Sequence, residues 1–411
     1  MLFDFFEKIS ICLGRQFQSP CAREGRIIYD SLLQICANPL KLCGQPPVRP
    51  PLHGISMTTL PTHLETAITR QMESYCPKSA DPTPLIAKSV ADLSTFYIEN
   101  PNTNTPYEKP WAQIASIAYY LPLNTLRAIA VLQHAVHLGF MHGVKTVCDV
   151  GSGLGAISFA AQNLGIRLER LECVEKSLWA TDTHRRMLGW AGGGSSGFAD
   201  HRWSVMTGTA AERLGTSVDL ITMSYSLTEF LTLPTWLQKI ENLLIIEPGT
   251  KEDSRALMEH RNTLIKMGFY IWAPCTHQLT CPLLIHSARD WCHDRIEWQQ
   301  PRWYQNIEAQ LPMQNRTLPF SYLLASKRRP PTSLQGLGRT VGDRQDEKGR
   351  SKQLICRDQR REFIVWQHRH GSAPNLGRGS LLTLSAGAKV AGDGLHPLPG
   401  EWAVAQLGSG V

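Results

Sequence analysis

The stretch that decides the fold is Val147-Cys148-Asp149-Val150-Gly151-Ser152-Gly153-Leu154-Gly155. The first half of this stretch is apolar except for Asp149 and predicts a buried strand. The three alternating glycines predict a tight turn into a helix. Glycine adopts a positive φ without a steric penalty and lets the backbone pass close to a ligand. The segment therefore predicts a strand, a turn and a helix, in which the glycines either form a ligand-binding loop or only shape the turn.

The spacing of the glycines distinguishes two kinds of nucleotide site. A dinucleotide site favours GxGxxG and seats a pyrophosphate at the helix N-terminus, whereas this spacing is GxGxG with Asp149 two residues before the first glycine. A carboxylate there would repel a pyrophosphate but would suit the cationic amino group of a methionine moiety. Glu175, at the end of the next apolar run, can accept hydrogen bonds from both ribose hydroxyls. We therefore predict an S-adenosylmethionine site that consists of Asp149, Gly151, Gly153, Gly155 and Glu175.

Short apolar runs alternate with helical spacers from residue 145 to residue 327, which is the pattern of a largely parallel sheet flanked by helices. The expected strands are Thr146–Val150, Leu171–Glu175, Trp203–Thr207, Asp219–Ser224, Leu243–Glu247, Phe269–Ala273 and Phe320–Ser326. Seven strands behind this glycine loop predict an α/β, Rossmann-like fold of the class I S-adenosylmethionine-dependent methyltransferase type.

Composition divides the chain into five parts. Residues 1–60 end in a Pro-rich stretch and predict a poorly ordered extension, and residues 61–142 show helical spacing. The methyltransferase domain is expected over residues 143–327. A basic extension with small β elements is expected over residues 328–390, and a flexible Gly-rich tail over residues 391–411.

Charge and cysteine content restrict the class of protein further. The 42 basic residues exceed the 35 acidic ones by seven, a mild excess, so nucleic-acid binding would need a local patch. The 11 cysteines are odd in number and follow no export signal, which predicts an intracellular protein with reduced thiols. No run approaches the roughly 18 apolar residues of a membrane span. We therefore expect no membrane association.

The residues after the fourth expected strand are those that usually orient a methyl acceptor in this fold. Here Glu229 is a candidate general base, and Tyr225 is a candidate stacking platform for a flipped base. The signature of amino-directed enzymes, Asp or Asn followed by two prolines and an aromatic residue, is absent. The alternative is that Tyr225 packs over the cofactor and Glu229 caps a helix, so the two are only candidate catalytic residues.

Three cysteines, Cys275, Cys281 and Cys292, fall in an insertion between the sixth and seventh expected strands. Soft metals and iron–sulfur clusters select thiolates, but the spacing lacks the close CxxC pairs of zinc fingers. Cys356, in the basic extension, is the candidate for a fourth ligand by elimination. One alternative is that these cysteines are small buried hydrophobes. Another makes Cys275 the nucleophile of a cytosine-directed methyl transfer.

A basic stretch runs from Lys327 to Arg369 and also holds Trp366. Such a surface could neutralise RNA phosphates, with specificity that comes from RNA shape. The alternative is a solvated face or a flexible tail. A metal ligand at Cys356 would attach this stretch to the fold, which favours the RNA interpretation.

These motifs together resemble the family of methyltransferase-like proteins of the mitochondrial small ribosomal subunit and their bacterial relatives. The resemblance covers roughly Tyr119 to Arg369. It rests on the glycine loop, on Tyr225–Glu229, on Ile246–Thr250, and above all on Ala273-Pro274-Cys275, Cys281-Pro282-Leu283 and Asp290-Trp291-Cys292-His293. The glycine loop is common to many methyltransferases, whereas the combination with the cysteine motifs is specific.

The resemblance implies a [4Fe-4S] cluster held by Cys275, Cys281, Cys292 and Cys356, with zinc as the alternative metal. It also implies association with the small ribosomal subunit and its rRNA, either as a methyltransferase or as a catalytically inactive assembly factor. We expect a monomer. A bacterial cytoplasm fits the missing presequence, and a mitochondrial matrix, which fits the eukaryotic members of the family, is the alternative location.

Overall fold

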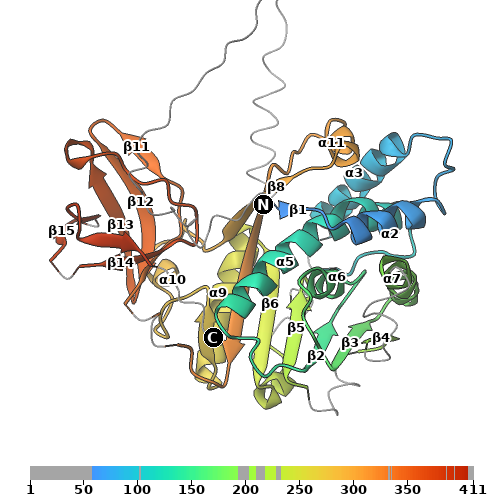
Figure 1. Ribbon diagram of the computed structural model, residues 1–411, viewed down its shortest axis with the longest axis horizontal. Helices are drawn as coiled ribbons and strands as arrows, with labels where there is room; N and C mark the ends of the chain where they lie inside the picture. The colour runs from blue at the N-terminus through green and yellow to red at the C-terminus, as the bar shows by residue number, and fades with distance from the viewer. Residues whose placement is uncertain are drawn as a thin grey trace, which may run out of the picture. The chain divides into compact units, whose positions relative to one another are not determined.

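The computed structural model describes residues 58–405 except 101–102, 193–202, 210–217, 228–232, 332–333, 335, 386 and 393. The described residues belong to one compact unit, in which an α/β sheet is followed along the chain by a second, mixed β-sheet (Figure 1). Of the extension expected over residues 1–60, residues 1–57 lie outside the described part.

All seven expected strands are present in the first sheet. They are β2 (Thr146–Val150), β3 (Arg170–Glu175), β4 (Trp203–Thr207), β5 (Leu220–Ser224), β6 (Asn242–Pro248), β7 (Tyr270–Ala273) and β9 (Thr317–Ser326). They lie in the order β4-β3-β2-β5-β6-β9, with β7 paired to β9. The strands from β4 to β6 pair in parallel, and β9 is antiparallel to both β6 and β7. This order, with one antiparallel strand inserted near the edge, is that of class I methyltransferases.

In the described residues this sheet is wider than the seven strands predicted. A strand β8 (Asp294–Gln299) pairs with the first part of β9, and β1 (Thr58–Thr59) pairs with β8 to complete nine strands. The sequence of β8 alternates charged residues with Ile296 and Trp298, and only alternate side chains are buried. A strand with one polar face has no continuous apolar run, so the apolar runs in the sequence did not indicate it. The boundary at residue 60 was therefore wrong, because Thr58 and Thr59 already belong to the sheet.

Each face of the sheet has its own apolar core. Consecutive residues of a strand point to opposite faces, so Val147 packs in one core and Cys148 in the other. The helices of the first face are α2 (Thr62–Met72), α3 (Thr83–Glu99), α4 (Pro110–Ala115), α5 (Leu121–His137), α6 (Ala156–Asn163) and α7 (Leu178–Ala191). The second face is covered by α9 (Lys251–Lys266). Burial on both faces explains the continuous apolar runs of the parallel strands.

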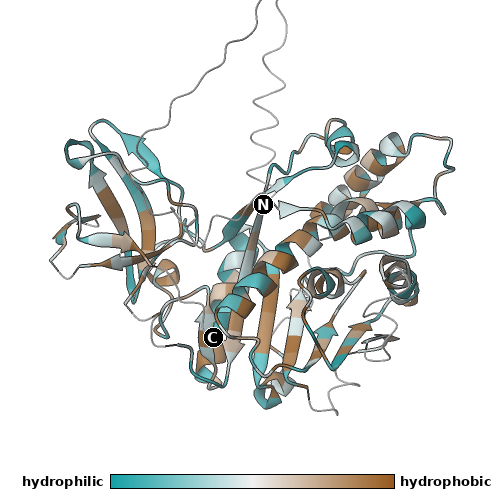
Figure 2. Ribbon diagram, in the orientation of Figure 1, coloured by the Kyte–Doolittle hydropathy of each residue, from teal (hydrophilic) through white to brown (hydrophobic). Residues whose placement is uncertain are grey.

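The helical run Pro110–His137, which includes a π-helical turn at Ser116–Tyr120, is long and apolar enough to cross a membrane by length and composition alone. The sequence shows no continuous apolar run of this length, because polar residues such as Asn124 and Arg127 interrupt it. Figure 2 shows α5 as a largely apolar helix beside apolar strands. Because 78% of its apolar window is buried inside the protein, this run packs as the core helix of a globular domain does.

The second sheet follows at residue 338. Its strands are β10 (Gly338–Thr340), β11 (Gln345–Glu347), β12 (Arg350–Arg357), β13 (Arg360–Gln367), β14 (Leu381–Leu384), β15 (Lys389–Ala391), β16 (Gly394–His396) and β17 (Trp402–Val404). Their order is β15-β16-β13-β12-β10-β14-β17, with β11 on β12. The flexible tail expected from residue 391 is contradicted as far as residue 405, because β16 and β17 pair with β13 and β14. Glycines here form turns between short strands, and residues 406–411 lie outside the described part.

Candidate functional site

The three glycines of the loop after β2 all adopt positive φ, at 68°, 51° and 88° for Gly151, Gly153 and Gly155. A Cβ atom on Gly151 would lie 2.5 Å from the Cβ of Ser226, and one on Gly155 would lie 1.9 Å from Nε2 of His184. Conformation and space therefore both require glycine at these two positions. The loop is held by Gly151 and Ser152, whose N–H groups donate to the carbonyl of Val174.

Asp149 is buried to 1% exposure at the sheet side of this loop. Its Oδ1 accepts a hydrogen bond of 2.6 Å from Thr222 on the neighbouring strand β5. Burial raises the pKa of Asp149 to about 7, partly offset by that hydrogen bond, and the nearby carboxylate of Glu175 raises it further. A cationic ligand group at the loop would favour the ionised form.

Glu175, at the end of β3, connects the two parts of the predicted cofactor site. Its Oε2 accepts from the N–H of Gly153 at 3.0 Å, and its Oε1 accepts from the N–H of Ser177 at 2.9 Å, just before α7. A carboxylate oxygen has more than one acceptor direction, so ribose hydroxyls could share these oxygens. The structure thus brings the glycine loop and the second acid together.

Three side chains that the sequence analysis did not single out surround the loop. The hydroxyl of Tyr107, from the segment before α4, would lie 3.3 Å from a Cβ on Gly153, and its ring stacks on Trp179 at 5.2 Å between centroids. His184 is fully buried against Gly155, and burial lowers its pKa to about 3. The Tyr107–Trp179 pair joins residues 72 positions apart (179 − 107), so no local pattern could reveal it.

On the acceptor side, Tyr225 directly follows β5 with a φ of 60°, which is unusual for a residue with a side chain. Its hydroxyl is buried, and burial raises the pKa of that hydroxyl while the nearby Arg127 lowers it. The guanidinium of Arg127 lies 5.9 Å from the ring centroid. Tyr225 is thus packed beneath an arginine, and Glu229 lies outside the described residues.

The Ile246–Thr250 motif has a structural explanation. Glu247 is buried, and its Oε1 accepts from the N–H of Leu227. Thr250 caps α9, because its Oγ1 accepts from the N–H of Asp253 at 3.0 Å. A Cβ on Gly249 would lie 2.8 Å from the backbone of β9. The motif therefore holds β6, α9 and β9 together.

The four predicted cysteine ligands come from four different segments. Cys275 follows β7, Cys281 is the N-cap of helix α10 (Pro282–His286), Cys292 precedes β8, and Cys356 lies in β12 of the second sheet. Cys281 and Cys356 share one apolar cluster, against which Cys292 packs. Burial raises the pKa of Cys356 well above its ordinary value, and Cys275, Cys281 and Cys292 raise it further. The four thiols therefore lie within electrostatic reach of one another.

Two buried arginines donate hydrogen bonds to these sulfurs. Arg261 of α9 is 1% exposed, and its Nε lies 3.0 Å from the Sγ of Cys275. Arg339 of β10 is 4% exposed, and its Nη1 lies 3.2 Å from the Sγ of Cys292, while it also pairs with Asp294. Each of these two sulfurs therefore has a guanidinium group beside it, although burial raises the pKa of Cys292 to about 12.

As the side chains stand, no group of three or more His, Cys, Asp or Glu residues in the described part is gathered closely enough to hold one metal ion. The nearest histidine contact is that of His277, whose Nε2 lies 3.7 Å from the Sγ of Cys356. A compact tetrahedral zinc site is therefore not preformed here.

Most of the predicted basic surface is engaged in internal contacts. Ion pairs join Arg339 to Asp294, Arg344 to Asp346, Arg350 and Lys352 to Glu347, Arg357 to Glu362, and Arg361 to Asp290. Lys327, Arg328 and Arg329 lie over the rings of Phe269, Trp272 and Tyr270. The surface able to meet phosphates is therefore much smaller than the sequence suggested.

The strand order, the positive-φ glycine loop and the acid at the end of β3 define a class I methyltransferase fold. Solved structures of this class resemble the chain only distantly. A SAM-dependent methyltransferase from Thiobacillus denitrificans is 15% identical with a TM-score of 0.30, over 49% of this chain and 91% of that one. The plantazolicin methyltransferase BamL is 12% identical with a TM-score of 0.35, over 60% and 99%. The strand order, and not these distant likenesses, defines the fold.

Within this class the chain belongs to the family described as mitochondrial small ribosomal subunit Rsm22, whose model matches residues 130–380. A relative of this chain is the human ribosome assembly protein METTL17, mitochondrial, which is 26% identical over 163 residues. That match covers 35% of this chain and 35% of the human protein. The chain thus matches about a third of the length of that relative.

Proposed function

We propose that this chain is an S-adenosylmethionine-binding, methyltransferase-like protein that acts on or with small-subunit ribosomal RNA and carries a [4Fe-4S] cluster. The observation that carries the cofactor part is the hydrogen bond from Gly153 N–H to Glu175, which forms one cradle from the loop and the acid. In this cradle Glu175 would bind the ribose, the glycines would line the methionine moiety, and Asp149 would balance its ammonium group.

The family description and the name of the human relative support a ribosomal role, and both are mitochondrial. We therefore propose the mitochondrial small subunit as the partner and the mitochondrion as the location, in place of the bacterial cytoplasm.

A second candidate function is a non-catalytic assembly factor with the same fold. The state of Tyr225 favours it, because its hydroxyl is buried and its ring is covered by Arg127. An acceptor base would have to displace this arrangement before methyl transfer. The cofactor cradle formed by the glycine loop and Glu175 supports the first candidate function, methyl transfer.

The residue types at the cysteine site support the cluster. Four thiols from separate segments lie within electrostatic reach of one another, and thiolates are the ligands of iron–sulfur clusters. Arg261 and Arg339 supply positive charge against a thiolate-bound cluster. A bound cluster would supply a structural link between the methyltransferase sheet and the second sheet, because Cys356 lies in the latter.

Cofactor binding and transfer are tested separately on the full chain. Isothermal titration with S-adenosylmethionine should give micromolar binding that Glu175→Gln weakens and Glu169→Gln, at an exposed surface ion pair, leaves unchanged. Methyl-transfer assays on small-subunit rRNA then decide between the two candidates. Binding without transfer supports the assembly factor, and absence of binding contradicts the cofactor proposal.

For the cluster, protein purified anaerobically should be brown, absorb broadly at roughly 400 nm and contain about four irons per chain. Cys356→Ser should lose iron, whereas Cys76→Ser, at a half-exposed thiol outside this group, should keep it. Colourless protein with stoichiometric zinc would contradict the cluster.

A further inference from the structure

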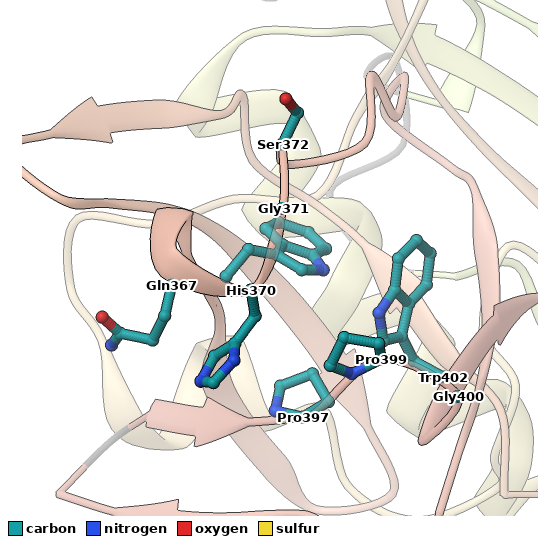
Figure 3. A pocket seen from close by; sticks show the side chains of 9 residues that line it. Gln367, His370, Gly371, Ser372, Pro397, Pro399, Gly400 and Trp402 are labelled. Carbon is teal, nitrogen blue, oxygen red and sulfur yellow. The ribbon is translucent and has the colours of Figure 1, made fainter.

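The second sheet carries a pocket that the proposed function has not used. Its volume is about 230 Å³, and it is lined by Trp366, Gln367, His370, Gly371, Ser372, Pro397, Pro399, Gly400 and Trp402. Pockets for drug-sized ligands have volumes of about 300–1,000 Å³, so this smaller space suits one planar ring system. Figure 3 shows His370, Pro397, Pro399 and Trp402 gathered around the same hollow.

Two tryptophans shape this pocket from neighbouring parts of the sheet. Trp366 ends the buried part of β13 and is 5% exposed, whereas Trp402 opens β17 and is only half-buried. Their ring centroids lie 5.9 Å apart at an interplanar angle of 72°, so the edge of one ring meets the face of the other. Trp366 thus fixes the orientation of Trp402, whose ring can present a stacking surface.

The rim of the pocket offers open space and polar groups. A Cβ atom on Gly371 or Gly400 would meet nothing within 4 Å. The amide of Gln367 lies 3.5 Å from a ring nitrogen of His396, and His370 is exposed beside it. Amide and imidazole groups can donate to and accept from the edge of a base.

Two cations lie on segments that are connected to the rim of this pocket. Arg369 and Lys348 are exposed, and among the described residues neither has a carboxylate partner, unlike most arginines of the same sheet. Arg369 immediately precedes His370 of the rim, and its Nε donates to the His370 ring. Lys348 precedes Gly349, whose carbonyl accepts from the N–H of His368. Lys348 is therefore attached to the same turn, His368–His370, that forms the rim.

We propose that this pocket binds one unpaired base of a single-stranded RNA segment, stacked on Trp402, while Arg369 and Lys348 contact the adjacent phosphates. Aromatic stacking combined with backbone cations is the general means by which proteins hold single strands. The inference rests on the RNA association proposed above and assigns one point of contact within it. A proline-rich peptide also seeks aromatic grooves, but it offers no negative charge to the two cations.

The test measures binding of a labelled ten-nucleotide single-stranded RNA to the full, cluster-loaded protein by fluorescence anisotropy. A second oligonucleotide with abasic sites keeps the phosphates and removes the bases. Trp402→Ala should weaken binding of the normal RNA by about 5- to 100-fold, which is the range expected for loss of one stacked base. Trp402→Phe should retain most of the affinity. Neither change should alter the weaker binding of the abasic RNA.

Arg369→Ala should weaken both oligonucleotides and reduce the slope of log K against log salt concentration by about 0.7, the value for one phosphate contact on a single strand. The matched control is Arg360→Ala, at the exposed turn on the opposite end of the β12–β13 hairpin, which should change neither. Equal affinity of the wild type for normal and abasic RNA would overturn the base pocket.

Two further outcomes also count against the inference. If Trp402→Phe and Trp402→Ala both bind normal RNA like the wild type, the pocket takes no base, although the RNA association itself can stand. If a proline-rich peptide binds and loses affinity with Trp402→Ala while RNA does not, the pocket belongs to a peptide. A wild type that binds no RNA at all contradicts the proposed function as well.

Discussion

Replacement of the buried Arg261 by methionine tests the arrangement of the cysteine site most sharply. Methionine keeps much of the length and volume of the side chain but removes every donor. In the structure Arg261 donates to the Sγ of Cys275 and to the side-chain oxygen of Asn262, at 3.0 Å and 2.8 Å. It also donates to the carbonyls of Leu279 and His277, at 2.8 Å and 2.7 Å.

The expected magnitude follows from these contacts. A buried carbonyl left without a donor costs about 1–3 kcal/mol. Arg261→Met leaves one such carbonyl, at His277, whereas the part-buried carbonyl of Leu279 can turn to water. The free energy of unfolding should therefore fall by about 1–3 kcal/mol in protein without a cluster, a measurable share of the total stability of an ordinary domain. The same change should reduce the iron retained after anaerobic purification, because the segment that holds Cys275 and Cys281 loses its anchor on α9.

The assay is urea unfolding, followed by tryptophan fluorescence under anaerobic, reducing conditions, with Arg360→Met as the control. Arg360 is exposed, so its replacement should change stability by less than about 0.5 kcal/mol. If Arg261→Met unfolds at the wild-type midpoint, the buried guanidinium does not hold this segment.

Three more predictions follow from the two sites. Gly155→Ala should abolish measurable S-adenosylmethionine binding in titration calorimetry, because its Cβ would overlap the ring of His184. The control Gly143→Ala is also at positive φ but has nothing within 4 Å of its Cβ. This control should bind normally and lose only about 1 kcal/mol of stability in thermal unfolding. Affinity for S-adenosylmethionine should rise about tenfold from pH 6 to pH 8, because burial raises the pKa of Asp149 to about 7 and only the ionised form attracts the ligand ammonium. Asp149→Asn should flatten this rise. If the pH profile of the variant equals that of the wild type, Asp149 takes no part in ligand binding. Cys281→Ser should lose iron and expose the junction of α10 with the second sheet to limited proteolysis, and retention of full iron content would remove Cys281 from the ligand set.

The sign of the Asp149 effect on stability is opposite to its effect on binding. Because the pKa in the folded state lies above that in the unfolded chain, the protonated carboxyl is favoured by folding. Without ligand, this group contributes stability that is fully present below about pH 4 and is lost as pH rises through 7. Asp149→Asn should remove that loss in thermal unfolding measured between pH 5 and pH 8.

The methyltransferase sheet could be predicted from the sequence because its strands are buried on both faces and appear as apolar runs. The largest difference in a strand boundary is at β9, which begins at Thr317 and not at Phe320. The strand β8 was missed because its charged positions alternate with Ile296 and Trp298. The Gly-rich end was interpreted as mobile because glycine signals turns and flexibility equally, and only the pairing of β17 with β14 separates the two.

The candidate sites could be predicted only in part. Cysteine and glycine motifs mark a ligand site by residue type, so Cys275 and Gly153 could be selected from the chain alone. The groups that hold them could not, since Arg339 and Cys292 lie 47 positions apart and meet only through folding. Ion pairing is also invisible in sequence, which is why the basic stretch suggested a larger phosphate-binding surface than the sheet offers.

Ultraviolet crosslinking of the protein to RNA in cells is the strongest test of its association with small-subunit ribosomal RNA. Small-subunit rRNA should dominate the recovered RNA, and the crosslinked peptides should come from the second sheet, near Trp402 and Arg369. Recovery of no RNA above background, or of RNAs unrelated to the small subunit, would contradict it.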